Sequence, residues 1–314
     1  MALEVKELVK KYGDKTVVDH LSFSMEEPGV FALLGTNGAG KTTTIRMILN
    51  MLAKDGGTVK WNGKDFHARE VNVGYLAEER GLYPKYRLMD QLMYFASLKD
   101  VPANVAKKRI KAWSEKLELD EYLYPVVKKR TAPSKNADQL SKGNQQKVQL
   151  MAAMISDPEL LILDEPLSGL DPVNTDLFKG IIREEIDKGK YIIMSSHQMP
   201  TIEEFCSDIV ILSRGKTVLK GNLNEIKKGY GRTNLIIKTE KDADSLIGSM
   251  GLKIKNKTPN ETLIKVESEE QANRLLKEII AKDLGIIRFE LREPSLHEIF
   301  VEKVGEEHDE EPEK

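Results

Sequence analysis

A glycine-rich stretch that ends in a lysine and a threonine gives the sequence its clearest chemical signal. It fits the spacing G-x-x-x-x-G-K-[ST], and its residues are Gly35, Thr36, Asn37, Gly38, Ala39, Gly40, Lys41 and Thr42. Glycines let the backbone wrap closely around an anion, so that successive N–H groups point at phosphate oxygens. The stretch therefore predicts a phosphate-binding loop (P-loop) for a nucleoside triphosphate, and a chance match is the weaker interpretation.

The segments around this loop are the ones that such a site needs. The apolar run 30–34 predicts a buried strand, and residues 43–49 predict the start of a helix. The helix N-terminus would add partial positive charge beside the phosphates. We expect Lys41 to reach the β- and γ-phosphates, the Thr42 hydroxyl to bind Mg²⁺, and Thr43 to belong to the nucleotide-binding residues.

Two neighbouring carboxylates close another apolar run. Asp164 and Glu165 follow residues 160–163, which are typical of a parallel strand buried on both faces. Downstream of a P-loop, an aspartate at this place supports Mg²⁺, generally through water, and the adjacent glutamate can orient or deprotonate a water molecule. In an unrelated protein, such a pair would more often cap a helix or form a salt bridge.

Two other side chains are weak candidates when they are taken alone. His197 follows the apolar run 191–196 and could hydrogen-bond the γ-phosphate, although a lone histidine at a strand end is usually structural. Tyr12 precedes the P-loop and could stack on adenine through its ring face. An ordinary turn tyrosine is the commoner case.

Composition excludes several classes of protein. The chain has 314 residues, 40% of them hydrophobic and 31% charged, and a net charge of −2, so it suits a globular protein of about two domains and gives no general support for nucleic-acid binding. The single cysteine, Cys206, excludes an intrachain disulfide framework and a zinc ribbon. We expect neither a signal peptide nor a membrane span, since no apolar run approaches the ~20 residues that a span needs.

The order of the segments predicts the fold class. Strand patterns alternate with helical ones through residue 228, including a helical pattern from Met89 to about Leu119, and this predicts an α/β domain with a mainly parallel sheet over residues 1–228. The turn Gly229-Tyr230-Gly231 suggests a boundary. Residues 232–304 read βαββαβ plus a helix, which predicts a small ferredoxin-like α+β domain. Residues 305–314 predict a disordered acidic tail.

The stretch Leu140-Ser141-Lys142-Gly143-Asn144 resembles the L-S-G-G-Q signature of the ATP-binding cassette (ABC) ATPases. The resemblance covers residues 3–228 and follows the family order: an aromatic residue, P-loop, mid-domain loop, signature, D-E strand, S-G-L-D loop and histidine. It implies an ABC-type nucleotide-binding domain that works as a nucleotide-sandwich dimer. The antiparallel β and helical subdomains of that fold are expected as well.

The resemblance also assigns roles. It implies that Tyr12 stacks on adenine, that Glu165 is the catalytic carboxylate, assisted by His197 and Lys41, and that Asp171 couples the two sites of the dimer. The signature residues Ser141, Lys142, Gly143 and Asn144 would complete the ATP site of the opposite subunit. Ser141 and the Gly143 backbone would contact its γ-phosphate.

The sequence departs from the family pattern at three of these positions. Glu78 stands where the mid-domain loop usually carries glutamine; a carboxylate can still bind Mg²⁺, but its charge puts the hydrolysis rate in doubt. Lys142 replaces glycine and Asn144 replaces glutamine in the signature. These variants and the C-terminal extension resemble the ATPases of bacterial sodium and drug efflux exporters.

Three functions are consistent with these features. The favoured one is the energy-coupling ATPase of a membrane transporter, bound to the cytoplasmic face of the cell membrane through a separate integral-membrane permease. A soluble ABC mechanoenzyme and a regulatory nucleotide sensor are the alternatives. We expect ATP and Mg²⁺ as cofactors, a homodimer or pseudo-homodimer of cassettes, and no nucleic-acid partner. The loop from Glu79 to Met89 is the expected contact with the permease, and the transported substrate is not encoded in this chain.

Overall fold

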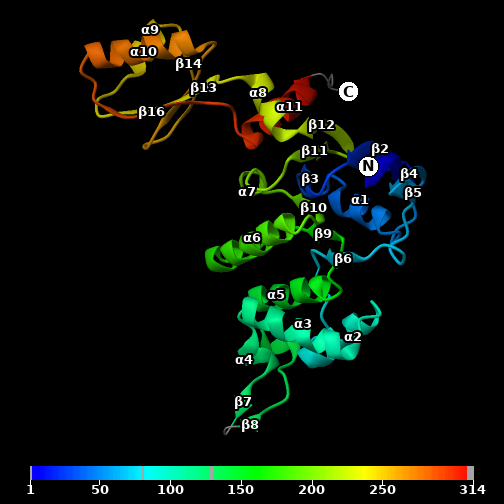
Figure 1. Ribbon diagram of the computed structural model, residues 1–314. Coiled ribbons are helices and arrows are strands. Elements are labelled where there is room, and N and C mark those ends of the chain that lie inside the picture. The colour runs from blue at the N-terminus through cyan, green and yellow to red at the C-terminus, as the bar shows by residue number, and fades with distance from the viewer. Residues whose placement is uncertain (1, 80, 128–129, 310–314) are drawn as a thin grey trace. The chain divides into compact units, whose positions relative to one another are not determined.

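The computed structural model describes residues 2–79, 81–127 and 130–309, which divide into two compact units (Figure 1). The first unit spans Met1–Lys220 and the second Gly221–Lys314. Each unit has its own cluster of buried hydrophobic side chains, as separate domains do. Among the helices of the described residues, none combines the length and the hydropathy needed to span a lipid bilayer.

The first unit is built on a six-stranded sheet with the order β12-β11-β3-β10-β9-β6. Its neighbours from β11 to β6 pair in parallel, as the alternating pattern predicted. The strands are β3 (Gly29–Gly35), β6 (Val73–Leu76), β9 (Leu160–Asp164), β10 (Tyr191–Ser196), β11 (Asp208–Ser213) and β12 (Lys216–Asn222). Because parallel strands end at the same edge, the P-loop after β3, the carboxylates after β9 and His197 after β10 meet there.

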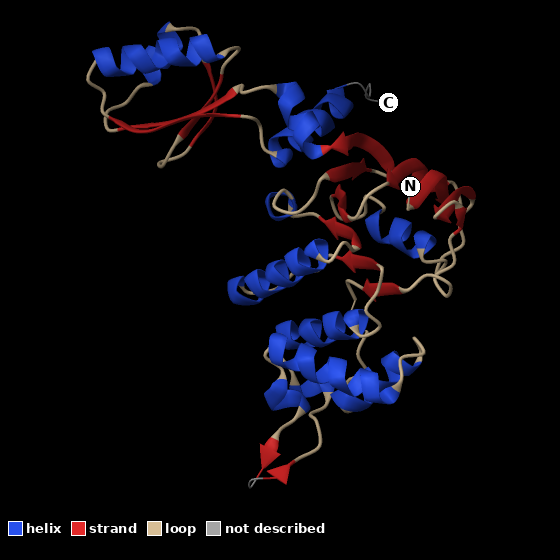
Figure 2. Cartoon of the chain, in the orientation of Figure 1, coloured by secondary structure: helices blue, strands red, loops and turns tan. Residues whose placement is uncertain are grey.

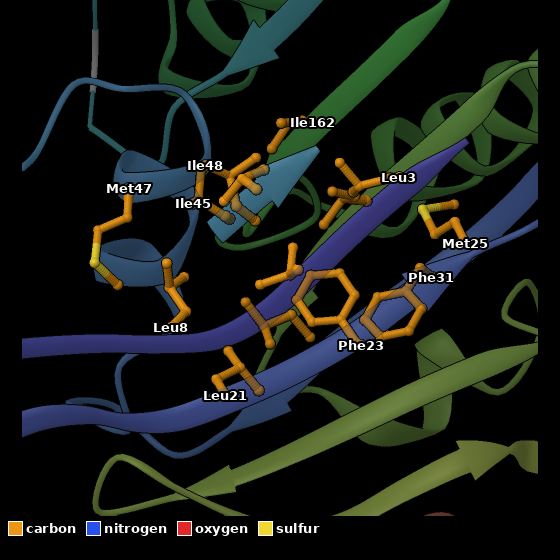
Figure 3. Close-up of a cluster of buried hydrophobic side chains, with 14 of the residues drawn as sticks. Leu3, Leu8, Leu21, Phe23, Met25, Phe31, Ile45, Met47, Ile48 and Ile162 are labelled. Atoms are coloured by element: carbon orange, nitrogen blue, oxygen red, sulfur yellow. The ribbon is translucent and has the colours of Figure 1, made fainter. Parts of the chain in front are cut away.

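A second, antiparallel sheet with the order β2-β1-β4-β5 belongs to the same unit. Its strands are β1 (Leu3–Tyr12), β2 (Lys15–Met25), β4 (Gly56–Trp61) and β5 (Lys64–Asp65). The larger hydrophobic cluster joins this sheet to helix α1 (Lys41–Ile48) and to β3 (Figure 3). Phe23 and Phe31 stack within it, with ring centroids 4.4 Å apart. The cluster therefore fixes the helix that carries Lys41.

The remaining elements of the first unit are mainly helical, and α2 to α5 lie together with a small hairpin at one end (Figure 2). They are α2 (Leu88–Ser97), α3 (Ala103–Lys116), α4 (Asp120–Leu123), β7 (Val126–Val127), β8 (Arg130–Thr131), the 3-10 turn Ala137–Gln139, α5 (Lys142–Met154), α6 (Pro172–Asp187) and α7 (Met199–Ile202). The helical pattern predicted from Met89 to Leu119 is thus interrupted. Asp100 adopts a φ of 54° and Pro102 precedes the first residue of α3, and neither suits a helix interior.

The elements of the second unit are α8 (Leu223–Tyr230), β13 (Asn234–Thr239), α9 (Asp244–Ser249), β14 (Lys253–Lys257), β15 (Thr262–Lys265), α10 (Glu269–Ala281), β16 (Ile286–Arg292) and α11 (Leu296–Asp309). From β13 onward they have the predicted order, and a helix that was not predicted, α8, precedes them. The four strands form an antiparallel sheet with the order β14-β15-β13-β16. This βαββαβ arrangement is the predicted ferredoxin-like one.

Two predicted boundaries differ from the structure. The units meet at Lys220 and Gly221 rather than after Lys228, because the glycine turn ends helix α8 instead of a domain: Gly231 follows α8 with a φ of 67°, a common helix stop. The acidic tail was predicted to begin at residue 305, but α11 continues to Asp309. Glutamate is a strong helix former, and this favours the continuation of the helix. The rest of the predicted tail, 310–314, lies outside the described residues.

The second unit is expected to fold alone. A fragment of residues 221–309 should melt cooperatively, because Leu235, Ile264 and Leu275 are fully buried in its own cluster. Leu275→Ala should lower the unfolding free energy by about 2–5 kcal/mol. Glu278→Ala, an exposed change on the same helix, should stay within about 0.5 kcal/mol. Circular dichroism during heating measures both, and a fragment without a cooperative transition would show that this unit depends on the first.

Candidate active site

The P-loop is held in shape by its glycines and by backbone contacts from outside the motif. Gly40 precedes α1 with a φ of 106°, and a Cβ there would lie 2.7 Å from the carbonyl oxygen of Val17. A Cβ on Gly215 would lie 2.6 Å from the same oxygen. The N–H of Gly215 also donates to the carbonyl of Ala39 at 3.2 Å. Only glycine fits at both positions.

The start of α1 offers unpaired backbone donors. The first bond inside the helix runs from the N–H of Thr44 to the carbonyl of Gly40, at 2.9 Å. The N–H groups of Lys41, Thr42 and Thr43 therefore have no partner within the helix. Donors at the positive end of a helix dipole make this a place for an anion.

The ammonium of Lys41 is buried against oxygen atoms. It donates to the carbonyls of Gly35 at 2.8 Å and Thr36 at 3.3 Å. It also lies 3.2 Å from Oε1 of Glu165, and both side chains are less than 10% exposed. The lysine charge thus compensates a buried carboxylate.

Asp164 is the last residue of β9, and its carboxylate has one satisfied and one unsatisfied oxygen. The Ser195 hydroxyl donates to Oδ1 at 2.5 Å, because parallel pairing places Ser195 of β10 directly beside Asp164. Oδ2 is buried and has no hydrogen-bond partner among the residues that the structure describes. Burial raises the pKa of the Asp164 carboxyl, against the lowering effect of hydrogen bonds from the Ser195 and Thr42 hydroxyls.

Glu165 lies between two basic side chains. Besides the contact with Lys41, its Oε2 lies 2.9 Å from Nδ1 of His197. Its N–H donates to the Ser195 hydroxyl oxygen at 3.0 Å, and its φ of 50° is unusual for a residue other than glycine. The backbone turn directly after β9 therefore aims the glutamate at the P-loop.

One side chain, Asn174, lies beside the signature stretch and is hydrogen-bonded to Asp171. Ser141 caps α5 by accepting the N–H of Asn144 at 3.2 Å, and Asp171 caps α6 by accepting the N–H of Asn174 at 2.9 Å. The Asn174 amide donates to the other Asp171 oxygen at 2.5 Å. A Cβ on Gly143 would lie 3.2 Å from that amide nitrogen. Hydrogen bonds from Asn174 lower the pKa of Asp171, and Lys142 is exposed.

The structure brings together five of the predicted site residues, and they are Lys41, Thr42, Asp164, Glu165 and His197. Glu78 is exposed on the loop after β6, so its predicted part in binding Mg²⁺ stays a prediction. Tyr12 is 53% exposed at the end of β1, with the Lys10 ammonium 5.3 Å from its ring centroid. The loop residues Asn37 and Gly38 are at the motif's turn, with Gly38 at a φ of 81°.

Sequence reasoning missed several residues of this region. Ser195 was visible only as a polar residue closing an apolar strand, and its pairing with Asp164 depends on strand register. Gln146 donates to the carbonyl of Pro166 at 2.6 Å and so ties α5 to the turn after β9. Burial and the charge of Asp164 raise the pKa of Tyr75 to about 12, so its hydroxyl stays protonated. Gln146 and Tyr75 had no recognisable signal in the sequence.

The P-loop, the buried carboxylates and the sheet order define a P-loop ATPase of the cassette type. The family described as ABC transporter matches residues 18–168, and the C-terminal domain of DrrA1-3-like ATP-binding proteins matches residues 221–304. This chain belongs to the ATP-binding proteins of ABC transporters: it binds nucleotide and is the ATP-hydrolysing, energy-coupling subunit of a membrane transporter. Such subunits pair with membrane permease components.

Individual relatives agree with this assignment. An uncharacterized ABC transporter ATP-binding protein of Bacillus subtilis (strain 168), YhaQ, is 41% identical over 96% of this chain and 98% of its own length. Nod factor export ATP-binding protein I of Ralstonia nicotianae is 33% identical over 71% of this chain and 68% of its own length. A solved ATP-binding subunit of an ABC transporter has a TM-score of 0.65 at 29% identity, covering 74% of this chain and 94% of that one.

The buried carboxyl of Asp164 predicts an unusual pH dependence. Because its folded-state pKa lies above the ordinary value, the folded chain holds this proton more tightly, and stability is lost as the pH rises through that interval. Asp164→Asn should therefore raise the melting temperature of the nucleotide-free protein, by more at about pH 7 than at about pH 5.

Asp157→Asn is the matched control, and its expected change in melting temperature has the opposite sign. The Lys190 ammonium lowers the pKa of Asp157, so its carboxylate stabilises the fold above its ordinary pKa and that stability is lost as the pH falls. This variant should melt lower than the parent near neutral pH. Scanning calorimetry across this pH range distinguishes the two, and a fall in melting temperature for Asp164→Asn at neutral pH would contradict the assigned cost of burial.

Proposed function

We propose that this chain binds Mg–ATP at the end of β3 and β9 and uses Glu165 as the hydrolytic base. The observation that carries the proposal is the placement of Glu165 between Lys41 and His197 at the mouth of the P-loop. The three N–H groups at the start of α1 and the Lys41 ammonium would hold the β- and γ-phosphates.

The residues present fit a magnesium ion. Within the described residues no group of three or more His, Cys, Asp or Glu side chains could hold a metal by itself, but phosphate oxygens and water supply most ligands in sites of this kind. Oδ2 of Asp164 is buried without a partner in the described ranges of the chain, and the Thr42 hydroxyl is near enough to lower the pKa of its carboxyl. Thr42 and Asp164 would therefore hold the ion, which supplies charge neutralisation at the phosphates. Glu78 is the further ligand expected from the sequence.

Lys41 and Glu165 act in sequence. Phosphate oxygens compete with the carbonyls of Gly35 and Thr36 and with Glu165 for the lysine ammonium. When Lys41 turns to the phosphates, Glu165 loses a counter-charge and becomes a stronger base, which accepts a proton from the attacking water. His197, bonded to Glu165, orients the carboxylate and contacts the γ-phosphate. Tyr12 stacks on the adenine.

Two chains are proposed to close on two nucleotides. Ser141 caps α5, and Lys142, Gly143 and Asn144 form its first turn, with Ser141 and Lys142 exposed. The helix N–H groups and the lysine charge there suit a γ-phosphate of a second copy. Asn174 links Gly143 to Asp171, which supports a role for Asp171 in coupling the two sites. The homodimer, or a pseudo-homodimer with a related cassette, is then the hydrolysing form.

The proposed roles of Lys41 and Glu165 predict different defects, one in ATP binding and the other in ATP turnover. Lys41→Ala should weaken ATP binding more than tenfold, ~1.4 kcal/mol or greater, because it removes the ammonium buried in the loop. Glu165→Gln should bind ATP without turnover and accumulate as a dimer with ATP but not with ADP. Nucleotide titration, phosphate release and light scattering measure these outcomes. Parental turnover in Glu165→Gln would exclude Glu165 as the base, whereas Glu78→Gln should be the milder change.

We further propose that the transporter is an exporter, that this chain lies on the cytoplasmic face of the membrane, and that the permease docks in an apolar groove. A relative is named for Nod factor export, which supports the direction. The groove, about 300 Å³, lies between β6, α2 and α5. It is lined by apolar side chains that include Leu76, Ala77, Leu82, Phe95, Leu98 and Ala153. An amphipathic helix of the permease would bury its apolar face there.

Cross-linking tests this groove. With Cys206 replaced by serine, a cysteine at Leu98, which lines the groove and is 61% exposed, should join the permease in native membranes. The yield should differ between ATP and ADP. A cysteine at Ile280, also exposed but in the second unit, is the control. Cross-links from position 280 alone, or from position 98 only to a second copy, would place the permease elsewhere.

A further inference from the structure

A second hollow of about 280 Å³ opens beside the apolar groove, and its chemistry is different. It is lined by Tyr83, Tyr86, Asp90, Gln91 and Tyr94, which we call the tyrosine cup. The three tyrosines are 52%, 65% and 51% exposed. Tyrosine is enriched in protein–protein interfaces and among the residues that contribute most to binding. Three exposed tyrosines around one hollow therefore indicate a contact site.

The cup is held rigid by one buried amide. Gln91 is 3% exposed, and its Oε1 accepts the N–H of Tyr83 at 2.8 Å. Its Nε2 donates to the carbonyls of Tyr83 at 3.0 Å and Tyr86 at 2.9 Å. The rings of Tyr83 and Tyr86 meet edge to face with centroids 5.8 Å apart. Because α2 thus fixes the loop, little conformational entropy is lost when a ligand enters.

The rings of the cup lack the cation that other tyrosines of this chain carry. Lys10, Lys111 and Lys135 place their ammonium groups 4.5 to 5.3 Å from the ring centroids of Tyr12, Tyr124 and Tyr122. In the part of the chain that the structure describes, no lysine or arginine is paired in this way with a ring of the cup. The ring faces that are not turned to one another or to Phe95 are therefore open to a cation from outside.

We propose that the tyrosine cup binds a positively charged side chain, arginine or lysine, of the protein that docks in the adjoining groove. Three electron-rich rings attract a cation, and the exposed Asp90 carboxylate adds a negative charge at the same place. The lining contains no aliphatic side chain, unlike that of the groove. Lys85 and Arg87 are exposed on the same loop, but neither lines the cup.

The two hollows adjoin along the chain. Leu82 lines the groove and Tyr83 the cup; Phe95 lines the groove and Tyr94 the cup, with these two rings 5.9 Å apart. One amphipathic helix can therefore place apolar residues in the groove and a basic residue in the cup. The identity of the partner as the permease rests on the function proposed above, whereas the preference for a cation rests on the cup alone.

A pair of small probes of equal shape tests that preference. Tetramethylammonium is a cation, and tert-butanol is a neutral molecule of similar size. The full-length protein is labelled with 3-fluorotyrosine, and the resonances of its nine tyrosines are assigned by single Tyr→Phe variants. Tetramethylammonium chloride, against sodium chloride of equal concentration, should shift the resonances of Tyr83, Tyr86 and Tyr94 saturably. Those of Tyr122 and Tyr124 should move less, because lysines already cover them.

Variants separate charge from shape. Asp90→Asn should weaken tetramethylammonium binding about threefold or more, whereas Asp100→Asn, an exposed change just beyond α2, should not alter it. Tyr94→Leu keeps an apolar wall but removes a ring face, and it should abolish the preference over tert-butanol. An equal response to both probes, or none to either, would overturn the cation site. A positive probe result without cross-links from the groove would reject only the permease docking.

Discussion

Two adjacent carboxylates buried at the end of one strand impose the main constraint on this molecule. An unpaired buried charge costs several kcal/mol, so the fold must bring compensating groups to Asp164 and Glu165. The sheet order does this by placing β10 between β3 and β9. Lys41 comes from the P-loop that follows β3, and Ser195 and His197 come from the end of β10. Oδ2 of Asp164 has no hydrogen-bond partner among the described residues, so this carboxylate is fully compensated only when a ligand binds.

The helical part of the first unit connects this site to its surface. Helix α5 begins at the signature residues, holds the turn after β9 through Gln146, and lines the apolar groove with Ala152 and Ala153. Strand β6, which pairs with β9, leads directly into the other side of that groove. A shift of α5 or β6 on nucleotide binding would therefore change the shape of the groove. In that case the coupling between the nucleotide site and the groove runs through a rigid helix and a rigid strand and not through a flexible loop.

The sequence predicted the elements of the site well because its motifs are local. The P-loop spacing, the apolar runs and the polar residues closing them depend on a few consecutive residues, and so does the strand–helix order of both units. Contacts across strands were not predictable: the bond from Ser195 to Asp164 depends on parallel register, and the link from Asn174 to Gly143 depends on how α5 and α6 pack. The positive φ of Glu165 has no signature in residue type.

The failed boundaries have the same origin. The glycine turn predicts the end of a domain, but a glycine indicates only a backbone conformation, and at Gly231 that conformation ends a helix. A run of glutamates predicts disorder, but glutamate is also a strong helix former, and α11 continues to Asp309. In both cases a local property, a backbone conformation or a composition, does not determine where a domain or an ordered segment ends.

The contact of Gly40 and Gly215 with one carbonyl of Val17 has a consequence for biosynthesis. Residues that shape the P-loop come from three distant parts of the chain, the last of them beyond β11. A ribosome delivers the chain from its N-terminus, so the loop lacks its final support until nearly the whole first unit has emerged. The P-loop of the nascent polypeptide thus gains its last backbone contact late, after residue 215 has been added.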